Sequence, residues 1–242
     1  TLKKQILADA MRIMGPDSSG ASAVRLNLAA IYRDAGRLDE AITLYKENLD
    51  EVSRALGLDH PETLASRYRL AGAYRDTGRL DEAIPLFEQN LTDFTRLAGP
   101  DHPETLASRG TLAGAYRDAG RLDEAIRLFE QNLAEVSRAL GLDHPETLAS
   151  RHSLAGAYRD TGRLDEAIPL FEQNLTDFIR ILGPDRPDTF TSRSTLASAY
   201  QAAGRIDDAI PLFEQNLEDR TRTLGPHDPR TLTSRDNLAG AY

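Results

Sequence analysis

Residues 60–101 read HPETLASRYRLAGAYRDTGRLDEAIPLFEQNLTDFTRLAGPD, and blocks of this length and pattern fill most of the 242-residue chain. The block that begins at His144 is identical to this one at 37 of 42 positions. A tyrosine and a glycine return once per block, as at Tyr74 and Gly78. A fixed period of this length predicts a solenoid of stacked structural units rather than a single globular core.

Each block carries the signals of two antiparallel helices. Pro61 suits the first position of a helix, which either Asp59 or His60 can cap. Gly78 suits the left-handed position that ends this helix. After a tight turn, apolar residues in 80–94 recur every three or four positions and form one stripe along a second helix. Neither helix can bury its stripe alone, so the pattern predicts stacked helical hairpins in an all-α fold.

The whole chain, residues 1–242, is expected to form one elongated domain. A leading helix at about 2–14 within residues 1–17 precedes the hairpins, and residues 228–242 supply a first helix that lacks its partner. Both ends look like edges of a longer protein, and apolar stripes left open there predict a capacity for end-to-end self-association. The five complete hairpins are expected at 18–59, 60–101, 102–143, 144–185 and 186–227.

Several kinds of chemistry are missing from the sequence. The chain has no cysteine, so disulfides and thiolate metal sites are excluded, and no lysine follows a glycine as a P-loop requires. The net charge of −9 argues against binding to nucleic acid or to anionic membranes. No membrane span or signal peptide is evident. We therefore expect a cytoplasmic protein without catalytic residues, cofactor or metal, and the histidines that recur once per block are expected to be cap or loop residues: His60, His102 and His144.

The block resembles the tetratricopeptide repeat, whose signature is Trp-x-x-Leu-Gly-x-x-Tyr followed by Ala-x-x-x-Phe. The corresponding residues are 67–74, RYRLAGAY, and 83–87, AIPLF. Arg67 replaces the tryptophan of the signature, and the period is 42 residues rather than 34. This longer version, which opens with His-Pro-Glu-Thr-Leu, is similar to the kinesin-light-chain and nephrocystin subgroup of the bacterial type.

The resemblance implies a right-handed superhelix whose concave groove is lined by the first helices and binds a peptide or a partner protein. It also leaves a second function open. Bacterial relatives commonly form the carboxy-terminal arm of large signalling proteins, so the chain could be the sensor or regulatory arm of a multidomain ATPase or protease. We expect a protein or peptide partner in either case, and neither nucleic acid nor a membrane.

The two residues before each Leu-Ala-Gly-Ala-Tyr motif change from block to block, as at 68–69 and 152–153, within an otherwise repeated frame. Residues 68, 69, 72 and 75 share the helix side opposite the apolar stripe. This varied stripe is the expected ligand-binding surface, although random drift at exposed positions would give the same pattern. The candidate residues are Asn27, Arg33, Tyr68, Arg69, Gly72, Arg75, Thr111, Gly114, Arg117, His152, Ser153, Arg159, Ser194 and Thr195.

Some residues in or beside this stripe have two interpretations. Gly72 and Gly114 would let a ligand backbone approach closely, or they would let two helices pack closely. Arg75 and its equivalents could hold ligand carboxylates, or they could pair with aspartates of the repeats. Arg67 and its equivalent in each block are expected to be structural, with the guanidinium paired to an acidic side chain. Acidic residues of the second helices, among them Asp93, are expected on the convex surface.

Overall fold

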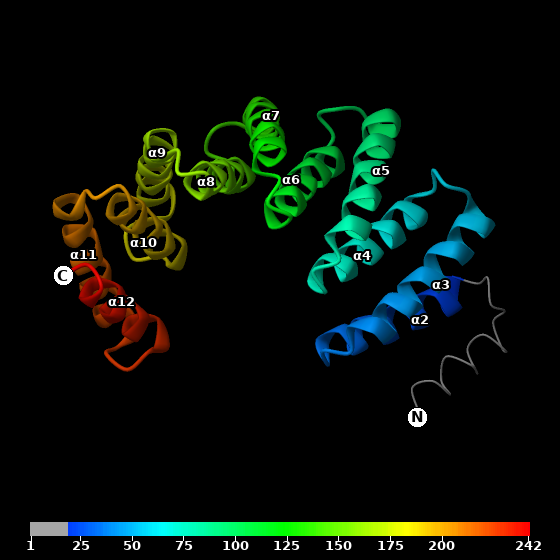
Figure 1. Ribbon diagram of the computed structural model, residues 1–242, viewed down its shortest axis with the longest axis horizontal. Helices are drawn as coiled ribbons and strands as arrows, with labels where there is room; N and C mark the ends of the chain where they lie inside the picture. The colour runs from blue at the N-terminus through cyan, green and yellow to red at the C-terminus, as the bar shows by residue number, and fades with distance from the viewer. Residues whose placement is uncertain (1–18) are drawn as a thin grey trace. The chain divides into compact units, whose positions relative to one another are not determined.

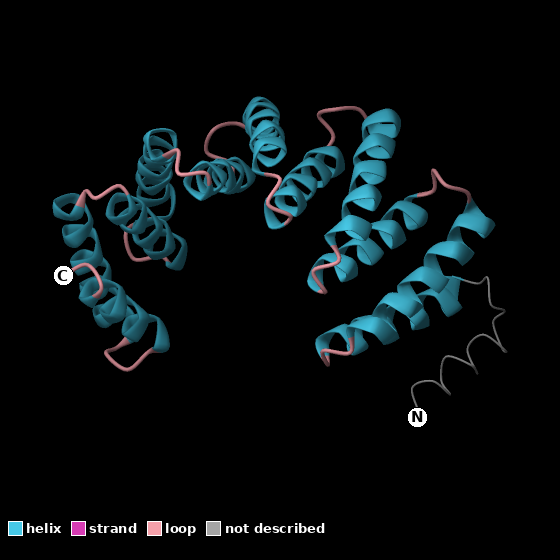
Figure 2. Cartoon of the chain, viewed as in Figure 1, coloured by secondary structure: helices cyan, strands magenta, loops and turns pink. Residues whose placement is uncertain are grey.

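The computed structural model describes residues 19–242, and within them helices and connecting loops make up the whole chain (Figure 2). The predicted leading helix at about 2–14 lies outside the described residues. None of the helices between residues 19 and 242 has the length and apolar character needed to cross a membrane. The helices are α2 (Ser19–Asp34), α3 (Leu38–Leu56), α4 (Pro61–Asp76), α5 (Leu80–Ala98), α6 (Pro103–Asp118), α7 (Leu122–Leu140), α8 (Pro145–Asp160), α9 (Leu164–Leu182), α10 (Pro187–Ala202), α11 (Ile206–Leu224) and α12 (Pro229–Ala239).

The chain divides into two compact units, residues 1–121 and 122–242. In the first unit, each helix from α2 to α6 packs against the next helix along the chain (Figure 1). The helices from α7 to α12 pack in the same sequential way within the second unit. The predicted all-α solenoid of stacked helical hairpins is thereby confirmed. That the chain forms one single domain with the expected repeat boundaries stays a prediction.

The ends of α4, α6 and α8 follow from residues that return at intervals of 42 positions. His60 is the N-cap of α4, and its Nδ1 accepts a hydrogen bond from the backbone N–H of Glu62 at 3.2 Å. Gly78 lies two positions beyond the last helical residue and has a φ of 73°, a left-handed conformation that glycine adopts without strain. These local signals fix where each hairpin begins and turns. The histidine cap recurs at His102 and His144.

A buried polar cluster joins the two helices of the α4–α5 hairpin. Arg67 Nη1 donates hydrogen bonds to Asn90 Oδ1 at 3.0 Å and to Asp93 Oδ2 at 2.6 Å. Asn90 Nδ2 in turn donates to the backbone carbonyl of Leu64 at 3.0 Å. None of these three residues is more than 6% exposed. The predicted pairing of this arginine with an acid is confirmed, whereas the prediction that Asp93 lies on an exposed acidic surface is wrong, because its carboxylate neutralises a buried guanidinium.

The same cluster recurs in the second unit and affects the acidity of its aspartates. Arg151 Nη1 lies 2.7 Å from Asp177 Oδ2, and Arg193 Nη1 lies 2.8 Å from Asp219 Oδ2. Burial raises the pKa of Asp177, but hydrogen bonds from Arg180 and Arg151 lower it by more, so its pKa lies below the ordinary 3.8. Asp177 therefore stays charged at neutral pH although it is half-buried.

Successive hairpins are linked by a tyrosine of one first helix and a glutamate of the preceding second helix. In the first unit, Tyr116 Oη donates to Glu88 Oε1 at 2.5 Å. In the second unit, Tyr158 Oη donates to Glu130 Oε1 at 2.5 Å. Burial first, and then this bond to a carboxylate, raise the pKa of Tyr158 to about 12. The period thus supplies a repeated polar link between hairpins as well as an apolar core.

Candidate functional site

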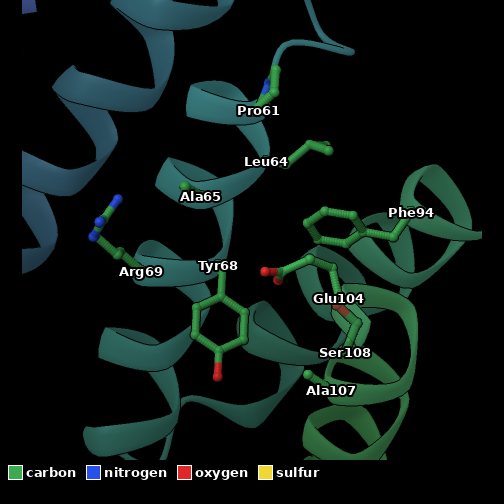
Figure 3. Close-up of a pocket in the computed structure, with 9 residues that line it drawn as sticks. All are labelled: Pro61, Leu64, Ala65, Tyr68, Arg69, Phe94, Glu104, Ala107 and Ser108. Carbon is green, nitrogen blue, oxygen red and sulfur yellow. The ribbon is translucent and has the colours of Figure 1, made fainter. Parts of the chain in front are cut away.

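A pocket of about 540 Å³ opens between α4, the end of α5 and the start of α6 in the first unit. We call it the Tyr68 pocket. The side chains of Tyr68, Phe94 and Glu104 point into it, as Figure 3 shows. Its floor is apolar and one acid lies at its rim, so it can accept an apolar group with a polar or charged neighbour. The remaining lining residues are Pro61, Leu64, Ala65, Arg69, Ala107 and Ser108.

Tyr68 is held at the pocket by two contacts. Its ring meets that of Phe87 edge to face, with the centroids 5.7 Å apart. Its hydroxyl lies 3.4 Å from Thr111 Oγ1 on α6. The side chain remains 44% exposed despite these contacts. Tyr68 and Thr111, two of the predicted site residues, are therefore brought together across successive first helices.

Arg69 connects this pocket to a second one on the other side of α4. It projects away from the Tyr68 side chain, toward α2 (Figure 3). There it lines a pocket of about 420 Å³ between α2 and α4, together with Leu26 and Glu62. Pro61 and Ala65 also line both pockets. The two pockets therefore adjoin along the first helices and share one ridge of α4 that carries a positive charge.

The second unit contains the same pocket at equivalent positions, with a volume of about 400 Å³. We call it the His152 pocket. Its floor keeps the residue types of the first pocket, including Leu148 and Phe178, which lie 84 residues beyond Leu64 and Phe94. Its rim differs, because His152 and Ser153 stand in place of tyrosine and arginine. The His152 ring meets the Phe171 ring edge to face, with centroids 5.4 Å apart.

Arg75, further along α4, takes part in an ion pair between hairpins. Its Nε donates to Asp118 Oδ2 on α6 at 2.6 Å. Its guanidinium also covers Gly114, where an added Cβ would lie 3.3 Å from Arg75 Nη2. The space beside Gly114 is therefore taken by an arginine side chain, whereas a Cβ at Gly72 would meet no atom within 4 Å. Arg75 and Gly114 are thus brought together, away from the residues that line the Tyr68 pocket.

The remaining arginines of the stripe lie mostly at the surface. Arg33 is exposed on α2, with its Nε 3.8 Å from Asp34 Oδ1, and Asn27 is exposed on the same helix. Arg159 Nη2 lies 3.3 Å from Asp160 Oδ1, while Arg117 is half-buried. Pairing with aspartates of the repeats, one of the two interpretations of this arginine ladder, is therefore present at Arg33, Arg75 and Arg159.

The small polar residues of the stripe are occupied by local hydrogen bonds. The hydroxyls of Ser153 and Thr195 donate to backbone carbonyls four residues earlier. Ser194 Oγ accepts a hydrogen bond from Asn216 Nδ2 of the same hairpin at 2.5 Å. All three side chains are half-buried. Among them, only Ser153 lines a pocket described here.

The sequence analysis did not single out several residues that line the pockets. Phe94 was assigned to the apolar stripe of α5, but it is only half-buried and forms part of the Tyr68 pocket. Glu104 received no role of its own. The signal was available, because Glu104, Ala107 and Ser108 are spaced by three and four on one side of a first helix. The pocket is recognised only when this side of α6 is considered together with α4 and α5 of the preceding block.

The described residues give no indication of a metal centre. Among residues 19–242, no three His, Cys, Asp or Glu side chains are grouped closely enough to hold an ion. The pockets themselves contain apolar side chains, isolated charges and hydroxyls. This composition suits recognition of another molecule by shape and charge.

The sequence matches the model of one known protein family along most of its length. The model of the tetratricopeptide repeat matches residues 20–92, 65–134, 110–176, 147–218 and 188–242. No curated protein sequence is significantly similar to the chain.

Among solved structures, the chain resembles the nearly identical TPR-like repeats of a Podosopora anserina protein described as a kinesin light chain. The identity is 36%, the alignment covers 82% of this chain and 94% of that one, and the TM-score is 0.75. BtubC (BKLC) from P. vanneervenii is 19% identical, with 94% and 91% covered and a TM-score of 0.76. A Rap protein complexed with competence and sporulation factor is 14% identical, with 98% and 71% covered and a TM-score of 0.63. These last two matches concern the fold alone.

Proposed function

This chain belongs to the tetratricopeptide repeat family, and on that premise we propose that it is a non-catalytic module that binds a peptide or partner protein. The contact surface is the row of pockets along the first helices. In the first unit it comprises the Tyr68 pocket and the adjoining pocket between α2 and α4. In the second unit it comprises the His152 pocket.

One observation supports this proposal above all others. The blocks that begin at His60 and His144 differ at only five of their 42 positions. Two of these differences, Tyr68 against His152 and Arg69 against Ser153, fall on the rims of equivalent pockets. Proline, leucine, alanine and phenylalanine are kept at four equivalent lining positions, whereas Ala107 is replaced by Thr191. A constant apolar floor with a varied rim is the arrangement expected where each repeat contacts a different part of one ligand.

The proposal is tested by crosslinking from inside the pocket. A photo-reactive phenylalanine derivative placed at Tyr68 should capture partner proteins from an extract of the source cells. The same derivative at Asp50, an exposed residue of α3 that lines none of these pockets, is the matched control. Mass spectrometry should identify partner peptides that are crosslinked at position 68 and absent at position 50. An identical set of products at both positions would contradict the proposal.

A rim exchange then measures the contribution of the varied residues. The double substitution Tyr68→His and Arg69→Ser copies the rim of the His152 pocket, so the fold should tolerate it. Affinity for the partner captured at position 68 should fall by about tenfold or more, because two central contacts are changed. Asp50→Asn should leave the affinity unchanged. Equal affinity of the exchanged and natural proteins would show that these rims do not contact the partner.

A further inference from the structure

Two positions that surround the pockets change character where α11 meets α12. The floor position occupied by Phe94 is apolar in each preceding repeat, but it is arginine at Arg220. The rim position occupied by Glu104 is acidic in each preceding repeat, but it is arginine at Arg230. An apolar floor with an acidic rim is thus replaced by two positive charges. The full series are Val52, Phe94, Val136, Phe178 and Arg220 for the floor, and Glu62, Glu104, Glu146, Asp188 and Arg230 for the rim.

Arg220 extends from α11 to α12 and has few partners there. Its Nη1 donates to the backbone carbonyl of Arg230 at 2.9 Å and to Ser234 Oγ at 3.1 Å. Its guanidinium carbon lies 5.7 Å from the centroid of the Phe190 ring. Its Nε is buried without a hydrogen-bond acceptor, and its Nη2 makes no hydrogen bond to a described residue. The side chain therefore keeps unused donors.

No carboxylate forms an ion pair with Arg220 among the described residues. Its neighbour Arg230 is already paired with Asp228, at 3.0 Å between Nε and Oδ1. Arg193 is likewise paired, with Asp219. Burial first, and then the nearby charges of Arg230 and Arg193, lower the pKa of Arg220, while Asp228 acts in the opposite sense. The cluster therefore carries one positive charge without a paired carboxylate.

Two other arginines that are shielded from water, Arg67 and Arg151, differ from Arg220 because each has a carboxylate partner. Arg67 and Arg151 both lie inside a hairpin, and each contacts an aspartate at 2.7 Å or less. A guanidinium that is taken out of water without a counter-ion is costly, which makes an added anion favourable. At Arg220 that anion has to come from another molecule.

We propose that Arg220, with Arg230 beside it, binds a carboxylate of the peptide that lies along the first helices. The inference rests on the proposed function, because it assigns the charge of one segment of that ligand. A single unpaired guanidinium matches one carboxylate better than a phosphate, which carries close to two negative charges. The ligand segment that reaches α10 and α12 is therefore acidic, while the segment at the His152 pocket of the same unit contributes an apolar group.

The test uses two short peptides as probes, acetyl-tetraglutamate amide and its glutamine counterpart. Binding to the full chain is followed at low salt by the NMR signal of the Arg220 Nε–H group, which reports on this site alone. The glutamate peptide should bind about tenfold more tightly than the glutamine peptide and should shift that signal. Equal binding of both peptides, or no binding of the glutamate peptide at millimolar concentration, would overturn the proposal.

Two variants link the effect to the side chain. Arg220→Phe installs the residue found at Phe94 and Phe178, and Arg220→Gln removes the charge while it keeps a polar side chain. Both should lose most of the preference for glutamate, whereas Arg222→Gln, which removes a neighbouring arginine that is paired with Asp185, should keep it. Preference retained in both Arg220 variants would contradict the assignment. A phosphoserine peptide that binds more tightly than the glutamate peptide would show that the ligand is not a carboxylate.

The outcome is separable from that of the proposed function. The rim exchange at Tyr68 and Arg69 alters binding in the first unit and should leave the glutamate preference intact. If the glutamate and glutamine peptides bind equally while the rim exchange still weakens the crosslinked partner, only the inference about Arg220 fails. If the rim exchange has no effect while the glutamate preference depends on Arg220, the proposed pocket surface fails instead.

Discussion

The residue pair Arg67 and Asp93 places one full charge on each helix of a hairpin, out of contact with water. Its two members depend on one another, because Arg67 needs a carboxylate to neutralise its buried charge, and Asp93 without Arg67 would keep only Gln89 and the exposed Arg96 as partners. The structural role of the arginine was predictable from its place beside the apolar stripe. The position of Asp93 was not, because the sequence pattern of α5 gives no sign of which partner on α4 its carboxylate meets. The pairing depends on the angle between two helices, and a linear pattern does not contain it.

Arg67→Met should therefore lower the free energy of unfolding by about 3 to 5 kcal/mol, since it leaves Asp93 charged and buried. The double variant Arg67→Met, Asp93→Leu should recover much of this loss, because no charge remains inside. Urea unfolding followed by circular dichroism measures both. Glu82→Gln, which breaks an exposed pair with Arg79, is the control and should have little effect. A double variant that is less stable than the single one would contradict this account.

The pH dependence of stability follows from the same residue. Burial raises the pKa of Asp93, but hydrogen bonds from Arg67, Gln89 and Arg96 outweigh it, and the pKa lies below the ordinary 3.8. A lowered pKa in the folded state contributes stability that is present above the unfolded pKa. That contribution should disappear as the pH falls from about 4 through the folded pKa. Asp93→Asn should make the acid side of the stability curve shallower, and an unchanged slope would exclude Asp93 as a contributor.

At the scale of the helix, the ends are better determined by the sequence than the interior. His60 and Gly78 fix the ends of α4 through their own backbone preferences, and both were predicted. Pro85 is different, because α5 continues through it from Leu80 to Ala98. Proline inside a helix removes one backbone hydrogen bond, which packing of the apolar face must offset.

Pro85→Arg should raise the free energy of unfolding by about 1 to 3 kcal/mol, since it restores the missing backbone donor. Arginine already stands at this position of α7, at Arg127, so the residue type suits the site. The side chain at position 85 is exposed, and no new packing is needed. Thermal unfolding and amide hydrogen exchange in the first two turns of α5 measure the change. A less stable variant would show that the proline is required for the local path of the helix.

At the scale of the whole molecule, repetition made the fold class predictable, and it also made the pockets hard to see. The Tyr68 and His152 pockets each combine positions from three helices, and residues such as Leu64 and Phe94 look like ordinary core positions within one block. Only the varied rim, Tyr68 with Arg69, was visible in the comparison of blocks. The proposed carboxylate site at Arg220 depends on the comparison of blocks, which shows the change of residue type. It also depends on the lack of a paired carboxylate, which only the structure shows.

The exposed face of α12 predicts association between molecules. Leu232 is 41% exposed, whereas its equivalent Leu64 is 2% exposed, and Tyr242 is 81% exposed against 4% for Tyr74. Sedimentation velocity should reveal complexes whose fraction rises with concentration, because apolar surface is removed from water when two molecules meet. Leu232→Glu should abolish them. Leu58→Glu, at a leucine that is 64% exposed elsewhere on the chain, is the control and should not. If the unsubstituted 242-residue chain stays monomeric at all concentrations, this prediction is wrong.

The tyrosine–glutamate links described above, such as Tyr116 to Glu88 and Tyr158 to Glu130, have a consequence for how such a chain can change over generations. Because the glutamate recurs every 42 residues from Glu88 to Glu214 and its tyrosine partner from Tyr116 to Tyr242, a recombination event that inserts or deletes one of these blocks leaves the new junction chemically matched. The length of the array can therefore vary without a compensating mutation. Each added unit also brings an intact pocket floor. Substitution of only the two rim residues, equivalent to Tyr68 and Arg69, is then enough to create a new contact.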